Sequence, residues 1–180
     1  ILHELSSGRT THVYKAAAGE QPLGAGPERV LLVPDRSVSG QLIENYARLA
    51  GKLNPGGSRD DLPKLAETFD RGIVTRTVAL PEDPESDVEL TALLMQKFPK
   101  GDTLLNRSDA LSWSDDKKYE VLISVAKTMR YLNDRHVVHR DLNPNNVWVG
   151  DNGEVIVFDF SNSEEILPGQ TPDPRSGFIG

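Results

Sequence analysis

The chain has 180 residues, of which 37% are hydrophobic and 26% are charged, a composition typical of a globular domain with a core of its own. It carries 27 acidic and 20 basic side chains, and the net charge of −7 argues against a nucleic-acid partner, for which a basic excess is expected. The lack of cysteine excludes disulfides and thiolate metal sites and favours a cytoplasmic location, and no apolar run reaches the ~18 residues of a membrane span.

The first half of the chain predicts several strands and one helix. Residues 5–16 have the pattern of a hairpin with polar turn residues, and residues 29–35 read as a buried strand ended by proline. Two longer strands are expected at residues 69–80 and 88–98, with an acidic, proline-containing loop between them. A helix is expected from residue 40 to the stop at residues 54–57, because apolar side chains recur there at helical spacing: Leu42, Ile43, Tyr46, Leu49 and Leu53.

A second helix is expected to begin after Ser114, whose hydroxyl can cap it. Acidic side chains come early in this segment and basic side chains come late, as the helix dipole favours. The predicted apolar stripe of this helix consists of Leu122, Val125, Met129 and Leu132.

The most informative stretch follows this second helix. It reads His139-Arg140-Asp141-Leu142-Asn143-Pro144-Asn145-Asn146, and Asp159-Phe160 follows thirteen residues after Asn146. Two apolar runs between these motifs, residues 147–149 and 155–158, flank an Asp-Asn-Gly turn and predict a hairpin. Such a hairpin would bring Asn146 and Asp159 together.

Asp141, Asn146 and Asp159 supply the groups that phosphoryl transfer needs. This chemistry requires bound Mg²⁺, shielding of the phosphate charges and an acceptor hydroxyl held in line. Asp141 is the candidate base for the hydroxyl proton, whereas the Asn146 amide oxygen and the Asp159 carboxylate are the hard oxygen ligands that Mg²⁺ prefers. A single Asp or Asn in a loop is more often a turn former, so the hypothesis depends on the joint pattern.

This joint pattern resembles the eukaryotic-type protein kinase superfamily, with its catalytic loop H-R-D-L-x-x-x-N and its metal motif D-F-G, except that Ser161 replaces the glycine. The resemblance implies an α+β, bilobal kinase-like fold. Residues 1–97 would form a small lobe with an antiparallel sheet and one regulatory helix, and residues 98–180 the first part of a mainly helical large lobe. It also implies ATP and Mg²⁺ as cofactors, a protein as substrate, and transfer of the γ-phosphate to a serine or threonine hydroxyl.

The resemblance assigns further residues to the nucleotide and to the support of the catalytic loop. The residues assigned to ATP are Leu5, Gly8, Val13, Met95, Gln96 and Phe98. The first three lie on the hairpin, which keeps one of the family's three glycines, and the others form the strand and hinge between the lobes. His139 is expected to pack against Phe160, and Arg140 to pair with a phosphorylated residue, for which Thr171 and Ser176 are candidates.

Departures from the family keep alternatives open. The strand at residues 29–35 lacks the family's phosphate-binding lysine, for which Lys15 and Arg36 are imperfect substitutes. The position of the lysine's glutamate partner falls on Asn45, with Glu44 one residue away. A pseudokinase that acts as a nucleotide-binding or regulatory scaffold is therefore one alternative. A small-molecule kinase similar to aminoglycoside or choline phosphotransferases is another, because those enzymes often carry Asn-Pro in the loop, as at residues 143–144. The full set of catalytic residues favours an active protein kinase.

The chain begins with Ile1 rather than Met and ends at Phe178-Ile179-Gly180. In the protein kinase superfamily that the chain resembles, such a Phe-aliphatic-Gly run commonly precedes the segment that docks the acceptor peptide. We therefore expect a piece of a longer polypeptide, and the remainder of its own kinase domain is an expected partner.

Overall fold

A computed structural model of the chain describes the residues in the ranges 3–7, 11–16, 29–34, 40–53, 63–65, 68–78, 86–167 and 169–170. The chain divides into two compact units. Unit 1 consists of Ile1–Ala47 and Thr68–Lys97, and unit 2 consists of Arg48–Glu67 and Phe98–Gly180. The assignment of residues 1–97 and 98–180 to two kinase lobes stays a prediction.

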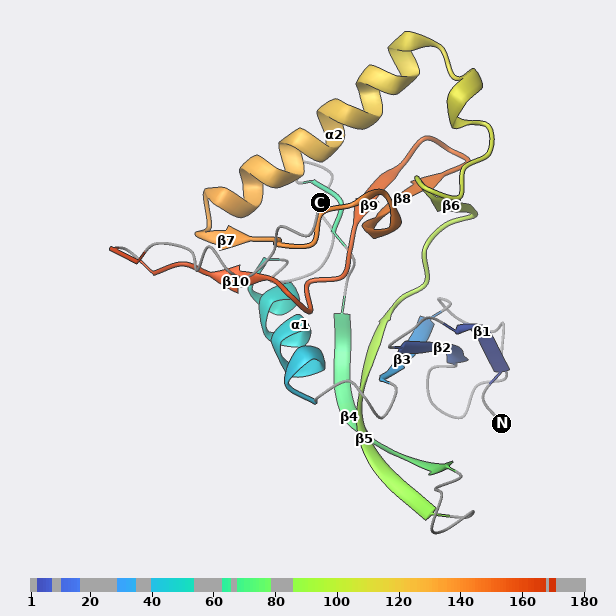
Figure 1. The fold of residues 1–180 in the computed structure, drawn as a ribbon, viewed down its shortest axis with the longest axis vertical. Helices are drawn as coiled ribbons and strands as arrows, with labels where there is room; N and C mark the ends of the chain where they lie inside the picture. Colours follow the sequence, from blue (N-terminus) through green and yellow to red (C-terminus); the bar gives the residue numbers. More distant parts are fainter. Residues whose placement is uncertain are drawn as a thin grey trace. The chain divides into compact units, whose positions relative to one another are not determined.

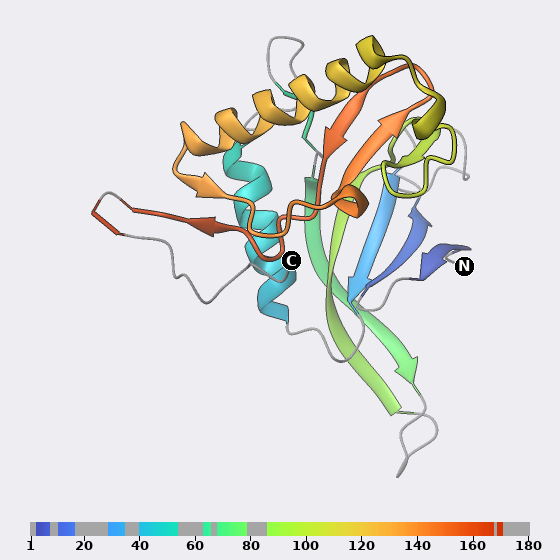
Figure 2. The ribbon, with the colours of Figure 1, turned by 45° about the horizontal axis from the view of Figure 1, so that its top comes forward.

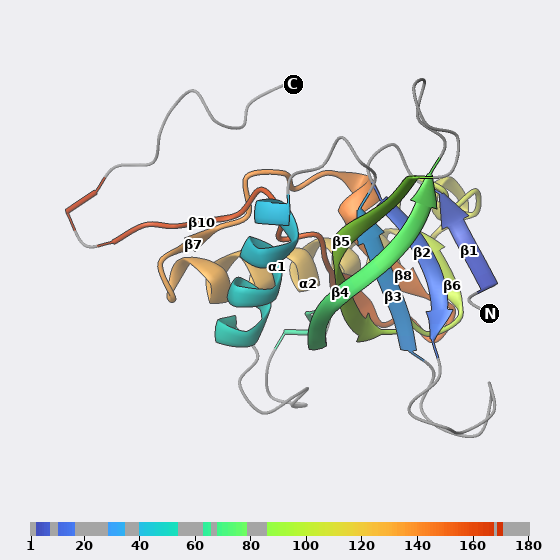
Figure 3. The same cartoon turned by 90° about the horizontal axis from the view of Figure 1, so that it is seen from below.

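Unit 1 contains a five-stranded antiparallel sheet, seen from below in Figure 3. Its strands are β1 (His3–Ser7), β2 (Thr11–Ala16), β3 (Arg29–Pro34), β4 (Thr68–Val78) and β5 (Ser86–Gln96). They lie in the order β1-β2-β3-β5-β4, and β4 and β5, with 11 residues each, extend well beyond the others in Figure 2. The sequence predicted each of these strands, with small differences at their ends.

The middle strand β3 explains why this sheet has a buried centre. It pairs with β2 on one side and with β5 on the other. Val30 and Val33 of β3 are buried, as are Ala92 and Leu93 of β5. Pro34 ends the strand, because proline has no N–H group to continue the ladder.

Helix α1 (Gly40–Leu53) has the predicted bounds and one apolar face. The side chains on this face are buried: Ile43, Tyr46, Leu49, Ala50 and Leu53. Leu42 is only half-buried, and Glu44, Gly51 and Lys52 are exposed. The spacing of the apolar residues therefore identified both the helix and, apart from its first member, the side that packs.

Unit 2 contains one long helix, short 3₁₀ turns and two small sheets, drawn from yellow to red in Figure 1. Besides the part of α1 from Arg48 onward, its elements are β6 (Gly101–Thr103), η1 (Ala110–Ser112), α2 (Asp115–Asn133), β7 (Val137–Val138), η2 (Pro144–Asn146), β8 (Val147–Gly150), β9 (Val155–Val157) and β10 (Glu164–Glu165). One sheet has the order β6-β8-β9, and β10 pairs with β7 in the other.

Helix α2 begins as predicted, and its packed face includes part of the predicted stripe. The Ser114 hydroxyl accepts a hydrogen bond from Lys117 N at 3.3 Å and caps the helix. The stripe is confirmed at Leu132, which is buried, and at Val125, which packs against the core. It is wrong at Leu122, since this side chain is 60% exposed and Val121 is buried instead. The buried side chains of the helix are Val121, Thr128, Tyr131 and Leu132. One residue corresponds to about 100° of rotation, so the packed face starts one position earlier than the predicted stripe.

The hairpin of β8 and β9 is present as predicted and packs under α2. Val147 pairs with Val157, and Val149 pairs with Val155. Gly153, in the turn, has a φ of 87°, which favours glycine. Val121 of α2 belongs to one buried cluster with side chains of this hairpin: Val147, Val149 and Val155. This packing fixes the hairpin whose base carries the candidate site.

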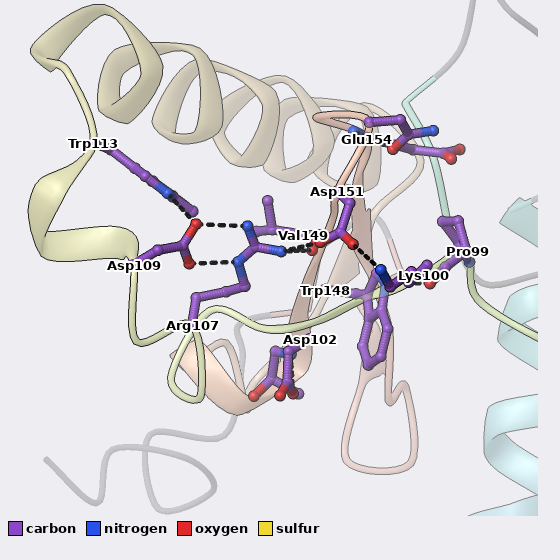
Figure 4. Close-up of polar contacts among 12 residues, drawn as sticks. Pro99, Lys100, Asp102, Arg107, Asp109, Trp113, Trp148, Val149, Asp151 and Glu154 are labelled. Atoms are coloured by element: carbon purple, nitrogen blue, oxygen red, sulfur yellow. Dashed lines mark hydrogen bonds and ion pairs between the residues drawn. The ribbon is translucent and has the colours of Figure 1, made fainter.

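A polar network holds the turn end of the same hairpin (Figure 4). The Arg107 guanidinium pairs with Asp109 at 2.8 Å and with Asp151 at 2.7 Å, and donates to the carbonyl oxygen of Val149 at 3.4 Å. The indole N–H of Trp113 donates to the Asp109 carboxylate at 2.9 Å. Arg107 therefore ties the segment before α2 to the β8–β9 turn.

Candidate active site

The catalytic-loop motif lies between β7 and β8, and its backbone bends sharply. Arg140 has a φ of 66° and Asp159, beyond the hairpin, has a φ of 64°. These values lie in the left-handed region, which costs a non-glycine residue about 1–3 kcal/mol and is found mainly at functional sites. The Asp141 N–H points to His139 Nδ1 at 3.4 Å, and Asn146 N donates to the carbonyl oxygen of Asn143 at 2.9 Å. Such internal contacts hold the bend.

Two amide groups hold the Asp141 carboxylate. Asn146 Nδ2 donates to Asp141 Oδ2 at 3.1 Å and to its carbonyl oxygen at 2.8 Å. Asn143 Nδ2 donates to Asp141 Oδ1 and to the same carbonyl oxygen, both at 3.1 Å. Each carboxylate oxygen therefore has its own amide donor, and the half-buried side chain is fixed in orientation. A fixed carboxylate at a loop is suited to accept a proton from an aligned hydroxyl.

Asn143 has a role that sequence reasoning missed. Besides its bonds to Asp141, its Oδ1 accepts from Asn145 N at 2.9 Å and caps the turn η2. The sequence did carry a signal, because asparagine before proline at the start of a turn is a typical cap. That signal predicts the cap only, since the bonds to the carboxylate depend on the fold of the loop.

The predicted hairpin brings the backbone of Asn146 next to that of the residue before Asp159. Asn146 ends η2 just before β8, and its carbonyl oxygen accepts a hydrogen bond from Phe158 N at 3.1 Å. Phe158 directly precedes Asp159 in the sequence. The two candidate metal ligands therefore lie at the two ends of the same hairpin, where its strands begin and end. Asn146 is buried, which agrees with a fixed rather than a mobile side chain.

Ser161 replaces the family's glycine and contacts the candidate metal ligand directly. Its hydroxyl donates to Asp159 Oδ1 at 2.6 Å, and its backbone N–H donates to the same oxygen at 3.3 Å. A glycine could make only the second of these bonds. Ser161 therefore adds one orienting contact to Asp159, which the sequence did not predict.

His139 contacts the Phe160 ring, as expected. The ring centroids are 5.2 Å apart, and both side chains are buried. The other His139 contacts identify the neutral form of the ring, because Nε2 donates to the Phe158 carbonyl oxygen at 3.0 Å and Nδ1 accepts from Asp141 N. Burial lowers the pKa of His139, although the bond to Phe158 opposes this shift. This histidine is therefore a neutral support between the two motifs.

Arg140 pairs with an acidic side chain of the chain itself. Its Nη1 donates to Glu164 Oε2 at 2.6 Å, and its side chain is only 14% exposed. The expected partner was a phosphorylated residue, with Thr171 or Ser176 as candidates, but both lie outside the described residues. Glu164 was not identified from the sequence.

Most of the residues predicted to bind ATP lie in strands of unit 1. Leu5, Val13, Met95 and Gln96 lie in β1, β2 and β5, and Gly8 lies outside the described residues. Val13 is half-buried. Phe98, in unit 2, packs its ring 5.4 Å from that of Trp148 and 5.1 Å from that of Phe158. Binding of a nucleotide by these residues stays a prediction.

The lysine expected on β3 is absent from that strand. β3 carries Arg29 at its beginning and otherwise apolar residues up to Pro34. Lys15 lies on the neighbouring strand β2, and Arg36 lies outside the described residues. Asn45, at the position of the glutamate partner, is half-buried on α1.

The oxygen groups of Asn146 and Asp159 suit Mg²⁺. The Asn146 NH₂ group makes both bonds to Asp141, so its Oδ1 is the atom that can serve a metal, and the Asp159 carboxylate is the second hard ligand. The described residues contain no group of three or more His, Cys, Asp or Glu side chains that could hold a metal ion. Mg²⁺ is commonly bound by one or two protein ligands together with phosphates and waters, so this pair fits it.

Comparisons with known proteins agree with the motif. The family "Protein tyrosine and serine/threonine kinase" matches residues 84–175, about half of the chain. The chain is 31% identical over 85 residues to sperm motility kinase Z of Mus musculus, a match covering 47% of this chain and 17% of that protein. It is 35% identical over 54 residues to serine/threonine-protein kinase Nek10 of Mus musculus (29% of this chain, 5% of that protein). It is 28% identical over 68 residues to Aurora kinase of Schizosaccharomyces pombe (38% and 19%).

The chain belongs to the protein tyrosine and serine/threonine kinase family. Its antiparallel sheets and two helices are consistent with part of a kinase-like fold. The matched segments cover less than a fifth of each of these relatives. Activity, substrates and partners of the whole protein therefore belong to the proposals below.

Neither helix in the described ranges has the length and apolar character needed to cross a lipid bilayer. The expected cytoplasmic location stays a prediction. The expected lack of a nucleic-acid partner also stays a prediction, since it depends on net charge alone.

Proposed function

We propose that this chain is part of an active protein kinase that transfers the γ-phosphate of ATP, with Mg²⁺, to a serine or threonine hydroxyl of a protein. Asp141 accepts the hydroxyl proton, and Asn146 and Asp159 hold Mg²⁺. When bound, Mg²⁺ neutralises charge on the transferring phosphate. The observation that carries the proposal is the Asp141 carboxylate held by two amides, one of which belongs to Asn146 at the hairpin base.

Family membership and relatives support the choice of acceptor. The family comprises protein kinases, and the matched Nek10 is named a serine/threonine-protein kinase. A protein hydroxyl is therefore favoured over a small alcohol, although Asn143-Pro144 also occurs in a pattern typical of small-molecule kinases. An acceptor panel that contains both classes tests this choice.

The first experiment is a phosphotransfer assay on the full-length protein, with ATP labelled at the γ-phosphate and both proteins and small alcohols as acceptors. Asp141→Asn should lower transfer by about 10²–10⁴-fold, because a general base acts on the chemical step. The affinity for ATP should change by less than about twofold, since the base does not hold the nucleotide in the ground state. Undiminished transfer by this variant would show that another group is the base.

A second experiment tests the metal site by calorimetric titration of ATP with and without Mg²⁺. Asp159→Ala should weaken the Mg²⁺-dependent part of binding, because it removes a carboxylate ligand. The control is Asp134→Asn, which changes a carboxylate on the exposed end of α2. Equal Mg²⁺ dependence in wild type and Asp159→Ala would contradict the assignment.

A pseudokinase is the second candidate function, and the composition of β3 favours it. Val33 of this strand is buried, Pro34 ends the strand, and the family's lysine is absent. A missing cation aimed at the phosphates commonly lowers the rate by about 10²–10³-fold. ATP binding without transfer to any acceptor in the first experiment would identify a pseudokinase, whereas transfer that requires Asp141 would exclude it.

A further inference from the structure

Glu164 and Glu165 form the strand β10, and their carboxylates pair with cations on opposite sides of it. Successive side chains of a strand point to opposite faces. Glu164 pairs with Arg140 of the catalytic loop at 2.6 Å. Glu165 pairs with Arg48 at 2.9 Å and also with Lys52, both near the end of α1. The two acids therefore attach β10 to the catalytic loop on one side and to α1 on the other.

Backbone and hydroxyl contacts fix the same segment. β10 pairs antiparallel with β7, the strand that leads into the catalytic loop. The Ser163 hydroxyl donates to the carbonyl oxygen of His139 at 2.9 Å, and Ile166 N donates to that of His136 at 2.7 Å. Because its backbone is held in this way, Glu164 loses less conformational entropy when it pairs with Arg140 than a mobile surface side chain would.

The Arg140–Glu164 pair is also partly shielded from water. Its side chains are 14% and 37% exposed, whereas the Arg130–Asp134 pair on α2 is 85% and 60% exposed and 3.9 Å long. Charge-assisted bonds of short length and reduced exposure are stronger than surface pairs, many of which contribute nothing measurable. The pair therefore has the properties of a structural clamp.

The clamp acts at the residue next to the candidate base. Arg140 has the left-handed φ of 66°, which requires support from its surroundings, and Asp141 follows directly. A contact that fixes the Arg140 side chain therefore helps to set the direction in which the chain enters Asp141.

We propose that Glu164 is a positioning residue for Asp141 and the built-in anion of Arg140, so that the catalytic loop takes its working geometry without phosphorylation. This inference rests on the proposed kinase function, in which Asp141 is the base. A phosphorylated residue that approached Arg140 would find its guanidinium already paired with the Glu164 carboxylate. Like-charge repulsion from Glu164 would oppose binding of that phosphate. A permanent ion pair thus replaces regulation by a phosphorylated residue that would bind to Arg140.

The test measures kcat and KM for ATP of the full-length protein before and after phosphatase treatment. Phosphatase treatment should leave kcat within about twofold of the untreated protein. Glu164→Gln should lower kcat by about tenfold or more, while KM for ATP changes by less than about twofold. Glu164→Asp, which keeps the charge, should recover part of the loss. The control Asp134→Asn removes the exposed pair on α2 and should leave kcat unchanged. Loss of transfer after phosphatase, or wild-type kcat in Glu164→Gln, would overturn the proposal.

Hydrogen–deuterium exchange separates this proposal from the proposed function. In Glu164→Gln, the backbone amides of residues 139–146 should exchange faster than in wild type, by about fivefold or more, and Asp134→Asn should not change them. This readout needs no activity, so a protein that transfers no phosphate would refute the kinase proposal while the exchange still tests the role of Glu164. Unchanged exchange in Glu164→Gln would overturn that role.

Discussion

The two ends of the β8–β9 hairpin hold their carboxylates in different ways. At the turn end, the Arg107 guanidinium pairs with both Asp109 and Asp151. At the base, the Asp141 carboxylate takes its contacts from the neutral amides of Asn143 and Asn146. Both ends are polar and well ordered by hydrogen bonds, but only the turn end balances negative charge with positive charge.

This difference distinguishes a structural acid from a candidate catalytic one. The bonds from Arg107 lower the pKa of Asp109 and that of Asp151, so these carboxylates are poor proton acceptors. A neutral amide orients a carboxylate without cancelling its charge, and an oriented anion is what a general base requires. We therefore expect substitutions at the base of the hairpin to change transfer, and substitutions at its turn to change stability.

After substitution of Asp141 itself, Asn143→Ala should have the next largest effect at the base end. It removes the donor to Asp141 Oδ1 and the cap on Asn145 N. We expect kcat to fall by about 10–100-fold with nearly unchanged affinity for ATP, because the base is present but less well oriented. Lost capping should cost about 0.5–2 kcal/mol of stability, measured by denaturant unfolding.

Asn145→Ala is the matched control for that substitution. Asn145 lies in the same turn and is exposed, and only its backbone N–H bonds to Asn143, so alanine keeps that bond. Its kcat should stay within about twofold of wild type. Equal losses in the two variants would mean that the turn, rather than the amide of Asn143, matters for transfer.

The pH dependence of stability should show a smaller effect at the base end. Burial lowers the pKa of His139 below the ordinary histidine value of 6.5, so the folded chain keeps the ring neutral where the unfolded chain takes up a proton. Stability should therefore be complete above about pH 6.5 and should decline as the pH falls below it, by at most about 1.4 kcal/mol per pH unit for one group. The decline is measured by thermal unfolding at a series of pH values from about 7.5 to about 5.5, the range in which histidine titrates.

His139→Gln supplies the comparison for the pH series. Glutamine can still donate a hydrogen bond but does not titrate, so the decline between neutral and mildly acidic pH should be shallower than in wild type. The same slope in both proteins would assign the decline to other groups.

The smallest effect is expected at the turn end, from Arg107→Ala. This variant loses the pairs with Asp109 and Asp151 and the contact over the Trp113 ring at 5.6 Å. Both carboxylates are about half exposed, so the thermal midpoint should fall by only a few degrees, and less at high salt. Phosphoryl transfer measured below that midpoint should be unchanged.

Acid titration sharpens this last comparison. In the folded chain, the pKa values of Asp109 and Asp151 lie below the ordinary aspartate value of 3.8. The Arg107 pairs therefore contribute fully above that pH and are lost as the pH falls through the lowered values. The stability curves of wild type and Arg107→Ala should thus converge in strong acid. Lys118→Ala, at an exposed pair with Asp115, is the control and should follow wild type throughout. A constant gap between wild type and Arg107→Ala would show that the lost contacts are not ionic.

Sequence reasoning succeeded where one local pattern was sufficient. The Ser114 cap, the apolar face of α1 and the Asp-Asn-Gly turn of the hairpin each follow from residues within a few positions of one another. The hairpin in turn brings Asn146 close to the metal motif. The α2 stripe failed at Leu122 because α2 carries apolar residues on more than one face, and contact with β8 and β9 decides which face is buried.

The sequence by itself determined the order of the longer strands and of both helices, and the hairpin that joins the two motifs, because periodicity and turn chemistry act over short distances. The tertiary structure decided which charges meet: Arg140 with Glu164, and Arg48 with Glu165. These partners are 24 and 117 positions apart, and long charged side chains have no periodic signal that names a partner. Only the pairing of β10 with β7, together with the fold around it, places these acids next to their cations.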